Sequence, residues 1–182
     1  MGCGAPGKKV NIPAILLMHQ TKGAGPMTFT DDRVWTIYLS GEIHTDWREA
    51  LAKGIKKAEL GVDITSPVLD HEDSDKCGTE ILGDEADKFW ADHKGAKLNA
   101  IRNRTLIETA DLVIVRFGDK YRQWNAAFDA GFAVANEKPL ITLHDAELDH
   151  ALKEIDAAAM ATCRNVEQIV KVLEYVIDGD LV

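Results

Sequence analysis

Cysteine is scarce in this sequence, with only Cys3, Cys77 and Cys163, which lie far apart. An odd number of cysteines without paired spacing fits neither a disulfide framework nor a cysteine-based zinc site. This usage is typical of a reducing compartment, and we therefore expect a cytoplasmic protein.

Long apolar runs and an excess of positive charge are also missing. No apolar stretch has the length that a membrane span requires. The net charge of -9 and the pI near 5.1 argue against a nucleic-acid backbone or an anionic membrane as partner. A small anionic ligand held by one or two local arginines is still compatible with this charge.

Motifs for common cofactors are absent as well. The sequence contains no GxGxxG, P-loop, nucleophile elbow or zinc motif. The acidic run Asp70–Asp75, with His71 inside it, matches no calcium-loop or zinc spacing, and we interpret it as a solvated loop. We expect neither a cofactor nor a metal ion.

The composition that remains is that of a soluble globular protein. The chain has 182 residues, of which 46% are hydrophobic and 28% charged, enough for one ordinary core. Residues 1–32 show no regular pattern and are predicted to be a poorly structured extension, with Met27 as a plausible natural start. Residues 33–182 are predicted to form a single domain.

Strand and helix patterns alternate five times from residue 33 onward. The expected strands lie at 34–39, 62–67, 111–115, 140–143 and 160–163. The expected helices lie at 46–61, with Asp46 and Glu49 as a capping box and Gly61 as the end, and then at 98–110, 124–137, 147–155 and 165–179. Residues 69–98 form an unusually long connection, with possible short helices near Glu80 and Phe89.

This alternation predicts an α/β flavodoxin-like fold: a five-stranded parallel sheet of order 2-1-3-4-5 with helices on both faces. In such sheets, ligands bind beyond the carboxyl ends of the strands, where the strand order reverses. Residues 40–44, residues 117–120 and the long connection after the second strand are expected to converge there.

Asp129 is the first candidate at this position. It interrupts a segment of small and apolar residues. Phe128, Gly131, Phe132 and Ala135 recur at helical spacing, which predicts that these four residues form one apolar helix face. The early turns of a helix favour an ionised carboxylate, which is what a carboxylate nucleophile requires. The alternative is an ordinary acid on a solvated helix face.

Two loops supply the other candidates. After the first strand, Gly41 allows close backbone approach, and Glu42, His44 and Arg48 are suited to binding hydroxyls or a phosphate. After the third strand, Lys120, Trp124 and Asn125 are suited to a base and a sugar. Alternatively, Glu42 and His44 are ordinary polar residues of a loop, Arg48 forms an ion pair with a surface acid, and Trp124 only covers the edge of the sheet.

Three segments of the chain are YLSGEIHTDWR, ADLVIVRFGDKYRQWN and DAGFAVANEKPLI. Together they resemble the YtoQ family, which is placed among the nucleoside 2-deoxyribosyltransferase-like proteins. The resemblance runs from about Arg33 to the C-terminus. The wider group shares a Tyr-Leu-x-Gly strand end, resembled by 38–41, and an Ala-Asp-x-Val strand start, resembled by 110–113. Its catalytic glutamate lies in a segment FExGxAxxxxKP, which 128–139 resembles with Asp129 in place of the glutamate.

The resemblance implies a deoxyribosyltransferase or N-glycoside hydrolase acting on a nucleoside or nucleotide, with no cofactor and in a homo-oligomer. Asp129 would attack the anomeric carbon and form a glycosyl ester, which water or a second base would resolve. Glu42, His44 or Asp73 would give the leaving base its proton. Further roles fall to residues that orient the sugar or close over the base: Tyr38, Asn125 and Trp124.

Two departures from that group favour a competing interpretation. Aspartate is one methylene shorter than glutamate, and the acid that members carry on the helix before the third strand is replaced by Asn103, between Arg102 and Arg104. These arginines favour an anionic ligand. The chain could therefore be an inactive nucleotide- or small-anion-binding or sensing module, or an oligomeric scaffold whose segment 69–98 completes a neighbour's site.

Overall fold

Five apolar runs form a parallel sheet in the computed structural model, which describes residues 33–120 and 123–181. The strands are β1 (Trp35–Gly41), β2 (Val62–Thr65), β3 (Leu112–Arg116), β4 (Leu140–Leu143) and β5 (Ala161–Cys163). Their order is β2-β1-β3-β4-β5, with every neighbouring pair parallel. The predicted flavodoxin-like order is confirmed. The predicted extension, residues 1–32, lies outside the described residues.

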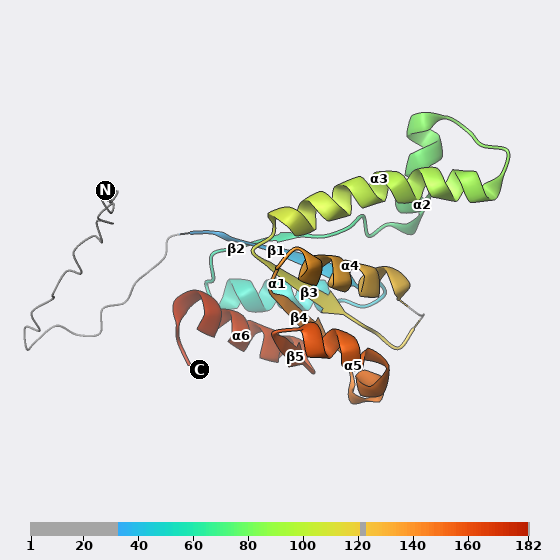
Figure 1. Ribbon diagram of the computed structural model, residues 1–182. Coiled ribbons are helices and arrows are strands. Elements are labelled where there is room, and N and C mark those ends of the chain that lie inside the picture. The colour runs from blue at the N-terminus through green and yellow to red at the C-terminus, as the bar shows by residue number, and fades with distance from the viewer. Residues whose placement is uncertain (1–32, 121–122, 182) are drawn as a thin grey trace, which may run out of the picture.

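The helices cover both faces of this sheet, as expected for buried parallel strands (Figure 1). They are α1 (Trp47–Lys57), α2 (His71–Leu82), α3 (Lys88–Thr109), α4 (Trp124–Ala135), α5 (Asp149–Ala158) and α6 (Val166–Asp178), with a short 3-10 helix, η1 (Ala146–Leu148), before α5. One core lies between the sheet and α1 and α6, and a second lies between the sheet and α3, α4 and α5. Among the described residues, no helix is both long and apolar enough to cross a bilayer.

Side chains of β1 alternate between these two cores. Ile37 and Leu39 enter the core beside α1 and α6, whereas Tyr38 lies in the core beside α3 and α4. Since side chains two residues apart share a face of a strand, Ser40 lies on the same side as Tyr38. This face of β1 is the one that α4 and Asp129 cover.

Helix α2 and residues 88–99 of α3 project beyond the sheet, and we call them the arm (Figure 1). The helices predicted near Glu80 and Phe89 are present as α2 and the start of α3, but the separate helix predicted from residue 98 is wrong, because α3 runs without a break from Lys88 to Thr109. In the arm, α2 and α3 contact each other at two glycines: a Cβ on Gly78 would lie 2.2 Å from the backbone nitrogen of Gly95. A side chain at position 78 is therefore excluded by the main chain of α3.

The acidic run after β2 is also helical, so the predicted solvated loop is wrong. The Asp70 carboxylate accepts a hydrogen bond from the Asp73 backbone N–H at 3.0 Å and so caps α2. Carboxylates are favourable in a first helical turn, where the helix dipole is positive. The acids of this run stabilise a helix start.

Two local predictions about α1 and α4 are wrong as well. Asp46 precedes α1 without a side-chain cap, and the helix ends at Lys57, before Gly61. In α4 the buried face consists of Ala126, Ala130 and Ala133 with Asp129, while Phe128 is 57% exposed. Small residues face the sheet because α4 packs closely against it.

Candidate functional site

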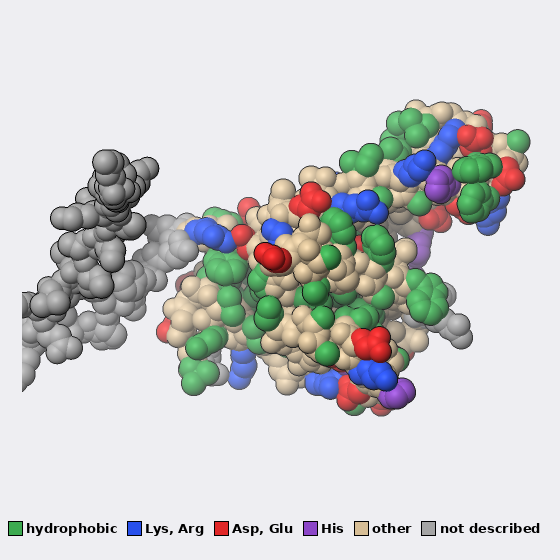
Figure 2. Space-filling view, viewed as in Figure 1, with side chains coloured by type: hydrophobic (Ala, Val, Ile, Leu, Met, Phe, Trp, Pro, Cys, Tyr) green, Lys and Arg blue, Asp and Glu red, His purple; other side chains and the backbone are tan. Residues whose placement is uncertain are grey.

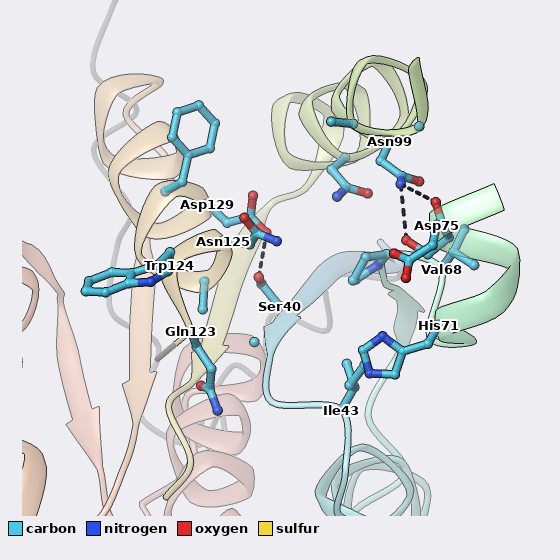
Figure 3. A pocket seen from close by; sticks show the side chains of 18 of the residues that line it. Ser40, Ile43, Val68, His71, Asp75, Asn99, Gln123, Trp124, Asn125 and Asp129 are labelled. Atoms are coloured by element: carbon cyan, nitrogen blue, oxygen red, sulfur yellow. Dashed lines mark hydrogen bonds between the residues drawn. The ribbon is translucent and has the colours of Figure 1, made fainter. Parts of the chain in front are cut away.

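A cleft of about 800 Å³ lies at the carboxyl ends of β1 and β3, the predicted position. This volume is within the range of small-molecule sites. One side is formed by the start of α4 and the other by the arm, with residues 40–44 between them (Figure 3). Eight of the predicted site residues line the cleft: Gly41, Glu42, His44, Asn103, Lys120, Trp124, Asn125 and Asp129.

Asp129 lies on the α4 side and is 9% exposed. The Ser40 hydroxyl donates a hydrogen bond to its Oδ2 at 2.6 Å (Figure 3). Burial raises the pKa of Asp129 above its ordinary range, and hydrogen bonding from Ser40 and Tyr38 opposes that rise. The cleft thus holds a carboxylate shielded from water and oriented by its neighbours.

Tyr38 is fully buried and does not line the cleft. Its hydroxyl is close enough to Asp129 to lower the pKa of that acid, although the contact lacks the geometry of a formed hydrogen bond. Burial, followed by the nearby Asp129 charge, raises the pKa of Tyr38 well above its ordinary range. Tyr38 is therefore neutral, with its hydroxyl near the Asp129 carboxyl group.

Glu42 is buried, and both of its carboxylate oxygens are engaged. Oε1 accepts a hydrogen bond from the His44 backbone N–H, Oε2 accepts one from the Thr45 hydroxyl, and Arg116 Nε lies 3.6 Å from Oε2. Burial alone would raise the pKa of Glu42, but Thr45, His44 and Arg116 together bring it below its ordinary value. This environment suits a fixed anion that shapes the loop better than a proton donor.

Arg48 points away from the cleft, in contrast to its predicted role in ligand binding. Its guanidinium donates to the carbonyl oxygens of Leu39, Gly41 and Glu42, and it stacks over the Trp47 ring at 4.5 Å. Burial lowers the pKa of Arg48 to about 10. The side chain holds the loop after β1 by satisfying its carbonyl groups.

Position 41 has to be a glycine because β3 passes close to it. Its φ is +95°, and a Cβ there would lie 1.9 Å from the Arg116 carbonyl oxygen. The Glu42 backbone N–H donates to that same oxygen at 3.0 Å. The close approach predicted for Gly41 is thus present, and it is an approach to β3.

The remaining predicted residues divide between the cleft and its surroundings. His44 lies at the cleft edge, with its ring stacked on His71 at 5.5 Å between centroids. Trp124 is 71% exposed on the opposite side, next to Asn125. Asp73 and Arg102 are exposed and do not line the cleft, and the Arg102 guanidinium donates to the Ser66 carbonyl oxygen at 3.4 Å.

Asn103 lines the cleft and contains a buried acceptor. Its Oδ1 has no hydrogen-bond partner among residues 33–120 and 123–181. A buried amide oxygen without a donor is costly, so a ligand with an N–H or O–H group would satisfy it.

Several cleft residues were missed by the sequence interpretation. Ser40 could have been found from its i+2 relation to Tyr38 in the strand. The arm residues depend on the fold of 69–98, since the Asn99 amide bonds Ser74 across α2 and α3 at 3.0 and 3.1 Å. These missed cleft residues are Ser40, Ser74, Asp75, Asp92 and Asn99.

A group with metal-ligand chemistry lies apart from the cleft, at the ends of β4 and β5. Ligand atoms of His144, Asp149 and Asp156 lie within 4.8 Å of one another. Arg164 Nη1 is 2.6 Å from Asp149 Oδ1 and 3.2 Å from His144 Nδ1, so a guanidinium already supplies the positive charge. The group is best understood as an internal polar network.

Comparison with known proteins gives matches to sequence and fold. The YtoQ protein of Bacillus subtilis strain 168 is 39% identical over 144 residues, covering 79% of this chain and 97% of its own. A solved structure of a protein from Enterococcus faecalis V583 has a TM-score of 0.54 at 13% identity, covering 79% and 99% of the two chains. A 2-deoxyribosyltransferase structure from Bacillus psychrosaccharolyticus has a TM-score of 0.47 at 16% identity, covering 74% and 90%.

A family model described as nucleoside 2-deoxyribosyltransferase YtoQ matches residues 38–177. The match includes β1 from Tyr38 onward, the other four strands and the residues around Asp129. With the strong likeness to the Bacillus subtilis protein, it shows that the chain belongs to the nucleoside 2-deoxyribosyltransferase YtoQ family.

Proposed function

We propose that this chain cleaves the N-glycosidic bond of a nucleoside or nucleotide, with Asp129 as nucleophile. The observation that carries the proposal is a buried, Ser40-bonded carboxylate in a cleft at the carboxyl ends of β1 and β3. Membership of a family described by nucleoside deoxyribosyl transfer supports this chemistry. No cofactor is needed for it.

The reaction proceeds in two balanced steps. An Asp129 oxygen forms a bond to the anomeric carbon while the bond from that carbon to the base nitrogen breaks. The electron pair of the broken bond goes to the base, which takes up a proton. Water then hydrolyses the glycosyl ester, or a second base accepts the sugar, as in retaining glycosidases.

His44 is the proton donor that the geometry favours among the three predicted ones. It lines the cleft, whereas Asp73 does not, and the Glu42 carboxylate already accepts two hydrogen bonds. A general acid must reach the leaving group directly or through one water. His44 lines the same cleft as Asp129 and is therefore our candidate for this role.

The other cleft residues supply recognition. Asn125 lies one helical turn before Asp129 and would bind sugar hydroxyls, and the Asn103 amide would accept a hydrogen from the ligand. Trp124 can stack on a base at the open edge. Lys120 and Arg104 give that side a positive charge that suits a phosphorylated substrate.

The experiment that tests this function is a ligand screen with product analysis. Purines, pyrimidines, nucleosides and their monophosphates are tested for stabilisation of the purified protein, and each binder is then incubated and analysed for released base by chromatography. A bound ligand raises the unfolding temperature by mass action. Release of base from a stabilising nucleoside supports the proposal.

A binding or sensing module is the second candidate, and the aspartate in place of a glutamate favours it. A carboxylate that is shorter by one methylene lies roughly 1–1.5 Å further from a sugar held in the same pose, which impairs direct attack. Under this alternative, the same screen gives stabilisation by a nucleotide without any released base.

Association with a second copy is part of the proposed function. Phe89 and Trp90 at the end of the arm are 64% and 54% exposed and pack edge to face, at 5.0 Å between centroids. Figure 2 shows apolar side chains at the surface of this end of the molecule. Exposed apolar groups of this kind mark interaction surfaces. A second copy suits this arm because the exposed Asp84 beside these rings is opposite in charge to Arg102 and Arg104 further along α3.

We expect Trp90→Lys to shift the protein to a lower mass in light scattering after gel filtration, because a charged side chain would replace the aromatic ring that the association of two copies would bury. Tyr175→Lys is the matched control, since Tyr175 is 59% exposed on α6, away from the arm. The control should keep the mass of the unchanged protein. A monomeric unchanged protein at micromolar concentration contradicts the association.

A further inference from the structure

Ser40 contacts Asp129, but the reaction proposed above assigns the Ser40 side chain no role of its own. It is the last residue before Gly41 in β1, is 2% exposed, and places its Oγ 2.6 Å from Asp129 Oδ2. Because an ionised carboxylate only accepts hydrogen bonds, the hydroxyl is the donor. Figure 3 shows this bond crossing from β1 to α4 at the base of the cleft.

The backbone on both sides of this bond is fixed. Ser40 pairs with Val115 and Gly41 with Arg116 in the sheet, and Arg48 binds the carbonyls of Leu39 and Gly41. A hydroxyl held this firmly restricts the rotation of the carboxylate that it binds. With Oδ2 engaged by Ser40, Oδ1 is the oxygen that is available to a ligand.

We propose that Ser40 is a positioning residue, which holds Oδ2 of Asp129 so that Oδ1 faces the anomeric carbon. The inference rests on the proposed function and deepens it. A short aspartate needs such support more than a longer side chain, because reaction requires the attacking oxygen at about 3–3.5 Å from the carbon. Hydrogen bonds to a charged group are also stronger than neutral ones.

The hydrogen bond has a second consequence, for the charge of Asp129. Ser40 is the largest of the influences that lower the pKa of Asp129 against the effect of burial. The attacking form is the carboxylate, so activity is present above this pKa and is lost as the pH falls through it. Without the hydroxyl the pKa rises, and the loss therefore begins at a higher pH.

The test is Ser40→Ala, with kcat and KM measured across pH. We expect kcat to fall about 10- to 100-fold, which is the range for a lost hydrogen bond to a charged group, with little change in KM. The acidic limb of kcat/KM should move to higher pH. Ser74→Ala is the matched control: it removes a cleft hydroxyl that bonds Asn99, and its acidic limb should not move.

A carboxyl titration followed by carbon NMR makes the result independent of turnover. The Asp129 signal is assigned by its absence in Asp129→Asn, and its midpoint should be higher in Ser40→Ala than in the unchanged protein. Equal midpoints, or an unmoved acidic limb, overturn the inference about Ser40. A shifted midpoint in a protein that releases no base instead overturns the proposed function while preserving the Ser40–Asp129 bond.

Discussion

Replacement of Asp129 by Asn should reduce base release by at least about 10³-fold, as expected for the loss of a nucleophile. The amide has nearly the same shape and can still accept the Ser40 hydrogen bond at its oxygen. Ligand binding, measured as a shift in unfolding temperature, should therefore persist. The rate is measured by chromatography of the released base under single-turnover conditions.

The same variant should be more stable than the unchanged protein at neutral pH. Burial raises the pKa of Asp129, so the folded protein binds this proton more tightly than the unfolded chain does. The carboxyl group therefore destabilises the fold increasingly as pH rises through its unfolded value, and an amide removes that cost. A gain in unfolding temperature together with lost turnover is the expected pair of results.

Asp63→Asn is the control for both measurements, because Asp63 is an exposed acid on β2 that does not line the cleft. It should change neither the rate nor the unfolding temperature appreciably. Turnover by Asp129→Asn at the unchanged rate would remove Asp129 from the mechanism. No turnover by the unchanged protein, with binding intact, would establish the binding module instead.

Gly41→Ala should cause the largest loss of stability, about 3–5 kcal/mol in the free energy of unfolding. Its φ of +95° is strained for any residue with a Cβ, and that Cβ would overlap the Arg116 carbonyl oxygen, 1.9 Å away. The strand end must move, and Glu42 and the base of the cleft move with it. Urea unfolding measures the first effect, and base release measures the second.

Gly131→Ala is the matched control, because it makes the same chemical change in the middle of α4. No atom lies within 4 Å of the Cβ that it would add. Alanine is favoured over glycine inside a helix by about 1 kcal/mol, so this variant should be slightly more stable. Equal effects of the two substitutions would contradict the account of Gly41.

The fold was largely predictable because its signals are local and repeated. Apolar runs such as 112–116 are long enough to identify buried strands, and their alternation with helices fixes a parallel order. The cap at Asn165 and the end at Gly179 were also predicted correctly, since both depend on neighbouring residues. The family resemblance is confirmed by the matches to the chain.

The site was only partly predictable because its geometry depends on contacts distant in sequence. Asp129 was singled out from its small neighbours, yet Ser40 lies 89 residues away, and only the folded chain shows that the two side chains meet. The face of α4 was misjudged, since the large Phe128 turns outward beneath Arg104 and alanines face the sheet. Arg48 resembled a ligand-binding group, but only the folded loop shows that it binds carbonyls.

The glycine contact within the arm limits how this cleft could be adapted to substrates of other sizes. Where Gly78 meets Gly95, a Cβ on Gly78 would lie 2.2 Å from the Gly95 nitrogen, so neither glycine can be exchanged for a larger residue without moving α2 and α3 apart. One boundary of the cleft is therefore fixed in place. New substrate preferences would have to arise by substitution of the side chains that line the cleft, at arm positions such as Ser74 and Asn99 or at exposed positions such as Trp124 and Phe128 on the opposite side.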